Sequence, residues 1–226
     1  MYQGALKLVQ PEARNHKEFV ATIYHNLGGL EHARGRYARG LPYACRAVEI
    51  RKTVQPRDRL ALAADEAALA AILVELGRIA EARRIYFRAL RVFRHRLAPR
   101  HYEVGAVWAN LGALYSRAAQ LALAERALRR GVCIMEETMG KNHPRIASAI
   151  NNLAVVCAHR GKLREATALY RRVLRLLEHR IPSTYPRAAL VRENCERLRR
   201  INSKAPLRPD SSGKRRIACH SLSYSE

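Results

Sequence analysis

Four short patterns recur along the chain at intervals of 42 residues. The first is Asn-Leu-Gly or a close variant, which begins at positions 26, 68, 110 and 152. The second places a small residue, mostly glycine, at 35, 77, 119 and 161. The third places Ala, Ala, Gly and Val at 47, 89, 131 and 173, each followed by an aliphatic residue, and the fourth has Pro56, Ala98-Pro99, Gly140 and Pro182. Because all four share one register, the sequence predicts a tandem array of like-sized structural units.

The apolar spacing within one copy is helical. One helical stripe, in a helix B, holds Ile79, Ala82, Tyr86, Ala89, Leu90, Phe93 and Leu97. The partner helix that follows it, Val104–Tyr115, carries Val107, Trp108, Leu111 and Leu114. Each unit is therefore predicted as two antiparallel helices, A and then B. The turn falls at the small residue of the second pattern, where a left-handed backbone costs glycine least, and the Pro or Gly of the fourth pattern ends helix B.

Small residues recur in helix A where helix B is expected to approach it closely. They are Gly28, Ala70, Gly112 and Ala154. A large side chain at these positions is expected to overpack the helix pair by roughly 1–3 kcal/mol.

The motif residues resemble the tetratricopeptide repeat. The resemblance lies in Trp108-x-Asn110-Leu111-Gly112-x-x-Tyr115 with Ala124, and in Gly161-Lys162-Leu163-x-Glu165-Ala166-x-x-x-Tyr170-x-x-Val173-Leu174. The 42-residue period and the Gly-x-x-His-Pro-x-x-Ala link from Gly140 to Ala147 are similar to the kinesin-light-chain variety of this repeat. The resemblance implies an all-α, right-handed α-solenoid of stacked antiparallel helix pairs, with the A helices lining a concave wall.

The register divides the chain into repeats and flanking segments. We expect a partial repeat with helix B only at 1–13, repeats at 14–55, 56–97, 98–139 and 140–181, a capping helix at 182–201 and a disordered basic tail at 202–226. Tyr2–Leu6 aligns with Tyr86–Leu90, so the chain is expected to begin inside a helix B whose helix A is absent.

The concave wall implied by the resemblance is the predicted binding site for a peptide or helix. Counting along the A helices gives the expected groove residues: His25, Asn26, Ala67, Ala71, Val74, Ala109, Asn110, Ala113, Ser116, Asn151, Asn152 and Val155. The amides of Asn26, Asn110 and Asn152 either bond the backbone of a bound peptide or bond neighbouring helices. Because most inner positions are alanine, we expect a partner with small or medium apolar anchors and not a clamp for a terminal carboxylate.

The chain is strongly basic, with 42 Lys and Arg against 19 Asp and Glu and a net charge of +23. The charge indicates either an anionic partner or a compositional bias toward arginine, which supplies 35 of the 42 basic residues. Many arginines fall on the predicted outer wall of B helices: Arg83, Arg84, Arg91, Arg94, Arg126, Arg129, Arg130, Arg171, Arg172 and Arg175. The alternative function is therefore binding of a nucleic acid, or of another polyanion such as an acidic protein, on this outer face.

The sequence contains no pattern typical of catalysis. There is no Gly-rich phosphate loop, no G-x-S-x-G and no H-E-x-x-H, and the five cysteines include no C-x-x-C pair. We therefore expect no enzyme activity, no metal, no cofactor, and cysteines that act as small buried hydrophobes. The longest apolar run, Ala67–Val74, is too short to cross a bilayer, which predicts a cytoplasmic protein without a membrane partner.

Overall fold

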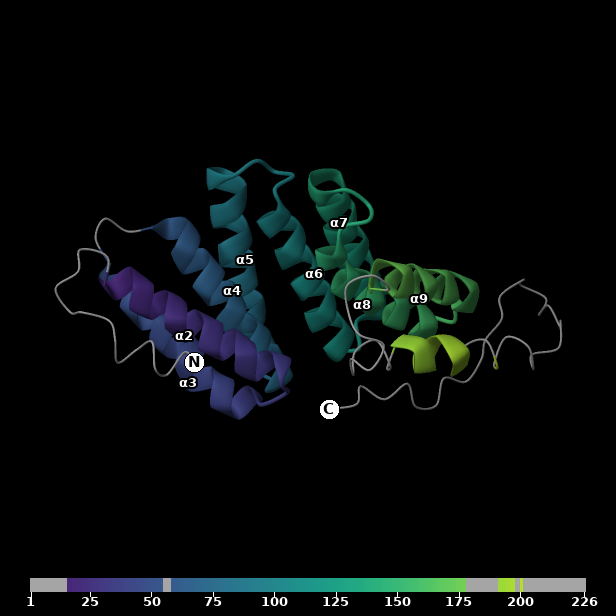
Figure 1. Ribbon diagram of the computed structural model, residues 1–226, viewed down its shortest axis with the longest axis horizontal. Coiled ribbons are helices and arrows are strands. Elements are labelled where there is room, and N and C mark those ends of the chain that lie inside the picture. The colour runs from purple at the N-terminus through teal and green to yellow at the C-terminus, as the bar shows by residue number, and fades with distance from the viewer. Residues whose placement is uncertain (1–15, 55–57, 178–190, 198–199, 201–226) are drawn as a thin grey trace. The chain divides into compact units, whose positions relative to one another are not determined.

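The computed structural model describes residues 16–54, 58–177, 191–197 and 200, and all regular structure in this part of the chain is helical (Figure 1). The elements are α2 (His16–Ala33), α3 (Tyr37–Thr53), α4 (Arg59–Glu75), α5 (Ile79–Arg96), α6 (Tyr102–Arg117), α7 (Leu121–Met139), the 3-10 turn η1 (Pro144–Ile146), α8 (Ala147–His159) and α9 (Leu163–Leu177). The predicted all-α fold is confirmed. None of the described helices combines the length and the apolar character needed to cross a membrane.

Consecutive helices form hairpins, and each hairpin turns where the sequence predicts. The turn residues Gly35, Gly77 and Gly161 have φ of 71°, 78° and 76°. Glycine adopts this left-handed backbone without the clash that a Cβ atom brings. The fourth turn is made by Ala119, which has φ of 57° despite its Cβ atom. It lies at the same position of the 42-residue register as the three glycines.

The chain forms two compact units, which are described separately. Unit 1 covers residues 1–107 and unit 2 covers residues 108–226. In unit 1, α2 packs against α3, α3 against α4, and α4 against α5; in unit 2, α7 packs against α8 and α8 against α9. The B helix of one hairpin thus contacts the A helix of the next, α3 on α4 and α7 on α8, as tandem stacking requires.

The apolar stripe predicted for residues 79–97 is the buried face of α5. Ala82, Tyr86, Ala89, Leu90 and Phe93 are buried, and the first and last members of the stripe are half-buried. The arginines predicted to lie off this stripe are exposed. Helix α5 therefore holds one apolar face against the core and one strongly basic face toward solvent.

Side chains at the start of three A helices satisfy backbone N–H groups that the helix itself leaves free. Asp58 accepts hydrogen bonds from Leu60 N and Ala61 N at the start of α4. The Nδ1 atoms of His101 and His143 accept from the backbone N–H two residues later, at 3.3 and 3.2 Å. These histidines are 42 residues apart, so the His-Pro link of the sequence has a local structural role as a cap.

Several predicted segments lie outside the described residues. They are the partial repeat at 1–13 and the basic tail at 202–226. The predicted capping helix at 182–201 is described at 191–197 and 200, which are helical and include the buried Val191 and Cys195. The division into four repeats and the handedness of the solenoid stay predictions.

Candidate functional site

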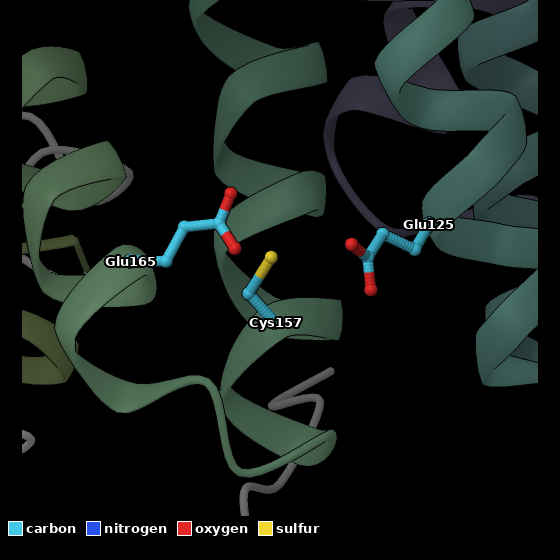
Figure 2. Close-up of side chains that lie close together, drawn as sticks. All are labelled: Glu125, Cys157 and Glu165. Atoms are coloured by element: carbon cyan, nitrogen blue, oxygen red, sulfur yellow. The ribbon is translucent and has the colours of Figure 1, made fainter.

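Three side chains with metal-binding atoms come together in unit 2. Glu125 on α7, Cys157 on α8 and Glu165 on α9 hold their ligand atoms within 4.8 Å of one another (Figure 2). The Glu125 carboxylate, however, already accepts from three cations: Arg129 at 2.7 Å, Lys162 at 2.6 Å, and Arg160. Figure 2 shows the side chains of Glu125, Cys157 and Glu165. Together with the three basic side chains that bind Glu125, they form an ionic cluster around this buried carboxylate.

The electrostatics of this cluster favour ion pairing over metal binding. Burial raises the pKa of Glu125, but hydrogen bonds from Lys162 and Arg129 outweigh burial and bring its pKa to about 2. Burial, reinforced by the charges of Glu165 and Glu125, raises the pKa of Cys157 to about 12, so the thiol is protonated at neutral pH. A metal ion would have to displace cations and a proton, so we assign the cluster a structural role.

The cysteines follow the prediction in part. Cys157 and Cys195 are buried, and Cys45 is half-buried with its pKa raised by burial. Cys133 lies on the exposed side of α7, which corrects the prediction for that residue because its position faces away from the core stripe. Cys219 lies outside the described residues. None of the four described cysteines forms a disulfide bond.

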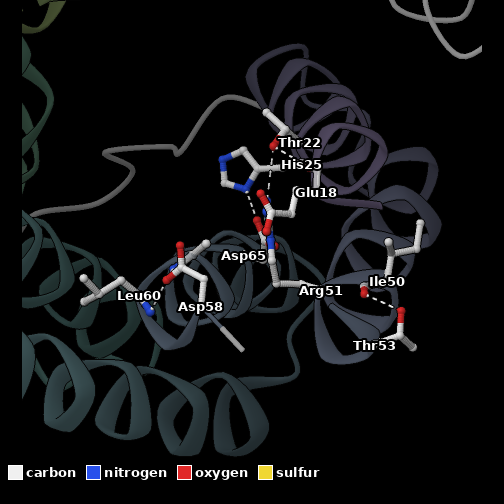
Figure 3. Close-up of polar contacts among 10 residues, drawn as sticks. Glu18, Thr22, His25, Ile50, Arg51, Thr53, Asp58, Leu60 and Asp65 are labelled. Atoms are coloured by element: carbon white, nitrogen blue, oxygen red, sulfur yellow. Dashed lines mark hydrogen bonds and ion pairs between the residues drawn. The ribbon is translucent and has the colours of Figure 1, made fainter. Parts of the chain in front are cut away.

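A polar network joins three helices of unit 1 around Asp65, which is only 3% exposed. Arg51 Nε on α3 donates to Asp65 Oδ2 at 2.7 Å, and His25 Nδ1 on α2 lies 2.9 Å from Asp65 Oδ1 (Figure 3). Arg51 Nη2 also donates to the Thr22 hydroxyl at 3.3 Å. Helices α2, α3 and α4 are therefore tied together by one buried carboxylate.

This network replaces apolar packing at a recurring position. The residues 42 and 84 positions after Arg51 are Phe93 and Met135, and those after Asp65 are Val107 and Ala149. All four equivalents are buried and apolar. A buried ion pair between such positions adds little net stability compared with apolar side chains, but it demands that both charged partners be present.

The network also fixes the orientation of His25, one of the predicted groove residues. The Asp65 carboxylate accepts a hydrogen bond from Arg51, and an ionised carboxylate has no proton to donate. In the contact between His25 Nδ1 and Asp65 Oδ1, the histidine is therefore the donor. The recorded contact of His25 within the described chain uses Nδ1 and leaves Nε2 without one. The His25 side chain is 35% exposed, so part of the ring is accessible to a ligand.

The asparagines of the A helices keep their side-chain amides free of hydrogen bonds to the described residues, and Asn26 is exposed to water. Among the residues that the structure describes, Asn26, Asn110, Asn151 and Asn152 make no side-chain hydrogen bond. The Asn151 Oδ1 atom is buried without a partner, and such an atom costs free energy unless something bonds it. The alternative in which these amides bond neighbouring helices has no support from the described contacts.

The other predicted groove residues differ in how much surface they offer. Ala67, Ala71, Ala113 and Val155 are half-buried, and Ser116 is half-buried and engaged in a polar contact. Val74 and Ala109 are 3% and 7% exposed, because both side chains turn into the helix packing. These two residues therefore belong to the core and offer little surface to a ligand.

One column of arginines in the B helices has a structural role that the sequence reading missed. Arg46, Arg88, Arg130 and Arg172 are each 42 residues apart. Arg88 binds Glu66 of α4 with two hydrogen bonds, at 2.8 and 3.0 Å, and Arg130 lies 4.6 Å from the ring centroid of Trp108 on α6. Glu66 and Trp108 are also 42 residues apart, so the same arginine position braces helix B against helix A in two hairpins.

Comparisons with known proteins agree with this geometry. Models of the tetratricopeptide repeat match residues 20–54, 60–137 and 146–179. The chain belongs to the tetratricopeptide repeat family. Repeats of this family generally mediate contacts between proteins. No protein of curated function matches significantly.

Solved tetratricopeptide-like structures share the fold. BtubC (BKLC) from P. vanneervenii has a TM-score of 0.63 at 16% identity, over 99% of this chain and 94% of that one. A putative kinesin light chain with nearly identical TPR-like repeats from Podosopora anserina has a TM-score of 0.60 at 20% identity, over 85% and 90%. The apo form of RapI has a TM-score of 0.57 at 15% identity, over 78% and 60%. These neighbours bear out the predicted kinesin-light-chain-like repeat.

Proposed function

We propose that this protein is an interaction scaffold that binds an extended peptide or a helix of a partner protein along its A helices. The observation that carries the proposal is the set of asparagine amides on α2, α6 and α8 that make no hydrogen bond within the described residues, with Asn151 Oδ1 buried and without a partner, together with the partly exposed ring of His25. A peptide backbone offers one donor and one acceptor per residue, which complements amide and imidazole groups. Catalysis, a cofactor and a metal have no part in this proposal.

The apolar surroundings of these polar groups indicate what the partner carries. Ala67 and Ala71 lie on α4 of unit 1, and Ala113 and Val155 lie on α6 and α8 of unit 2. Short side chains leave space for small or medium apolar anchors of the partner, and the amides would fix its register. We place the binding in the cytoplasm, away from membranes.

A library of displayed peptides provides the probe. Peptides selected on the full chain are synthesised with a fluorescent label, and their affinity is measured by anisotropy for the wild type and for Asn110→Ala/Asn152→Ala. Each lost hydrogen bond weakens binding by roughly 0.5–1.5 kcal/mol, so the double variant should bind about 5- to 150-fold more weakly. Asn142→Ala removes an exposed amide from the turn before η1 and serves as the matched control.

Two results would overturn the proposal. One is unchanged affinity of every selected peptide for the double variant and for His25→Ala. The other is an equal loss in Asn142→Ala, which would mean that the amides act at no particular surface.

A further inference from the structure

The solvent face of α5 carries arginines that the protein itself does not neutralise. Arg83, Arg84, Arg91 and Arg94 are exposed, and within the described part of the chain none of them forms an ion pair. The one acidic residue of α5, Glu81, is held by Arg78 at 2.6 Å. Like charges three and four residues apart oppose helix formation, so this arrangement is not explained by the stability of the helix.

A large apolar side chain lies at the centre of these arginines. Phe87 is 44% exposed, whereas the other two aromatic side chains of the same helix, Tyr86 and Phe93, are almost completely buried. Arg83 and Arg91 are one helical turn before and after Phe87, so the ring and the guanidinium groups share one helix face. This combination was not visible in the sequence, where the exposure of Phe87 could not be read.

The remaining outer-face arginines differ from this group. Arg129 pairs with Glu125 and Glu165, Arg172 pairs with Glu136, and Arg130 lies over Trp108. Among the described arginines of α7 and α9, the ones without an ion pair are Arg126, Arg171 and Arg175 of the predicted outer wall and also Arg164. Within the described residues of α7 and α9, the large apolar side chain exposed to solvent is Leu123, near the start of α7. Among the described residues of α5, α7 and α9, it is therefore α5 on which four free cations surround an aromatic ring.

We propose that the α5 face, defined as Arg83, Arg84, Phe87, Arg91 and Arg94, binds an acidic segment of another protein that carries one large apolar side chain. The guanidinium fork matches a carboxylate in shape and charge, and Phe87 supplies the apolar contact. The face spans 12 residues of helix, from Arg83 to Arg94, a length of about 16 Å, which suits about three turns of an acidic helix. A single exposed ring fits such a segment better than single-stranded nucleic acid, which stacks successive bases on several rings.

This surface lies on a B helix and does not depend on binding along the A helices. Its failure and the failure of the proposed function are therefore separate results. Because the attraction is largely electrostatic, binding at this face should weaken as salt is raised.

The test uses three labelled probes and the full chain. The first is a peptide of three helical turns with glutamate on one face and a central leucine, the second has serine in place of that leucine, and the third is an oligouridylate of equal charge. Anisotropy is measured for the wild type, for Arg83→Gln/Arg84→Gln/Arg91→Gln/Arg94→Gln, and for Phe87→Ser. The matched control removes the same charge from unit 2: Arg126→Gln/Arg164→Gln/Arg171→Gln/Arg175→Gln.

The expected results separate this face from net charge. The wild type should prefer the leucine peptide, the α5 variant should bind it at least about tenfold more weakly, and the unit 2 control should lose much less. Phe87→Ser should weaken the leucine peptide and leave the serine peptide unchanged. The proposal is overturned by equal losses in the two charge variants, by no binding of the leucine peptide, or by tighter binding of oligouridylate that does not respond to Phe87→Ser.

Discussion

At the scale of single residues, Asp65 is a charged residue at a repeat position that is apolar in later repeats, and it needs a charged partner nearby. Its carboxylate lies where the next two repeats have Val107 and Ala149, and it is buried together with Arg51. Apolar residues at such a junction tolerate small changes, whereas an ion pair fails when one partner is removed. The junction of α2, α3 and α4 is therefore more sensitive to single mutations than its counterparts.

We predict that Asp65→Ala lowers the free energy of unfolding by about 3–5 kcal/mol, because it leaves the Arg51 charge buried and unpaired. The double variant Arg51→Met/Asp65→Ala reproduces the pair Met135 and Ala149 of a later repeat and should recover most of that loss. Urea unfolding followed by circular dichroism measures both. A double variant no more stable than the single one would contradict this explanation.

The lowered pKa of Glu125 leads to a prediction of how the free energy of unfolding depends on pH. Its ordinary pKa of 4.5 falls to about 2 in the folded state, so the carboxylate contributes stability above its unfolded pKa. That contribution is lost as the pH falls from about 5 to about 2. Glu125→Gln should therefore be less stable than the wild type near pH 7 and equally stable near pH 2.

Unfolding in urea at several pH values, followed by the fluorescence of Trp108, measures this difference. The chain has one tryptophan, and it lies in unit 2 with Glu125. Asn142→Ala, which alters no ionisable group, is the control. A stability difference between Glu125→Gln and the wild type that stays constant across this pH range would argue against the ionic cluster.

At the scale of the helix pair, glycine sets how closely two helices approach. A Cβ atom on Gly112 of α6 would lie 2.4 Å from Leu128 Cγ and 3.1 Å from the carbonyl oxygen of Ala124, both on α7. Leu128 is fully buried and has no room to move. The same atom on Gly28 would meet Ala44 at 3.3–3.5 Å, which is tight but not a clash. The predicted packing role thus holds most strictly at Gly112.

We predict that Gly112→Ala destabilises the protein by about 1–3 kcal/mol, because overpacking outweighs the gain in helix propensity. Gly29→Ala is the matched control, since a Cβ atom there meets nothing within 4 Å. It should raise stability by roughly 0.5–1 kcal/mol, the usual advantage of Ala over Gly inside a helix. Thermal unfolding of the two variants measures the contrast, and a rise in the stability of both variants would show that helix propensity outweighs overpacking at Gly112.

At the scale of the whole molecule, the net charge of +23 produces a long-range electrostatic repulsion among the basic side chains. Part of this charge is used locally, as in Arg51, Arg88 and Arg129, which bind carboxylates. The arginines that lack such partners repel one another, and this repulsion favours the unfolded chain. The balance predicts an unusual response to salt for a protein that also contains ion pairs.

We predict that the Tm rises as sodium chloride is raised from about 0.01 M to about 0.15 M, because screening relieves the net repulsion more than it weakens buried pairs. The rise should be smaller in the Arg→Gln variants of the α5 face, which carry less charge. Differential scanning calorimetry measures both proteins. A Tm that falls with salt would mean that surface ion pairs outweigh the net charge.

The repeat, the helix pairs, the turns and the core stripe of α5 could all be predicted from the amino-acid sequence. These features depend on local chemistry, since helical spacing, a left-handed turn and an overpacked small residue follow from neighbours within one hairpin. The A-helix asparagines were also found from the register alone. That their side chains make no hydrogen bonds within the described residues is evident only from the structure.

The contacts between side chains of different hairpins could not be predicted from the sequence and depend on how the helices pack. This packing brought Arg51 and His25 to Asp65, buried Val74 and Ala109, exposed Phe87 and Cys133, and separated the paired arginines from the free ones. A period of 42 residues repeats the backbone, but a contact between two repeats depends on both side chains and on the angle at which the helices pack. That angle is set by packing and cannot be read from the spacing of residues.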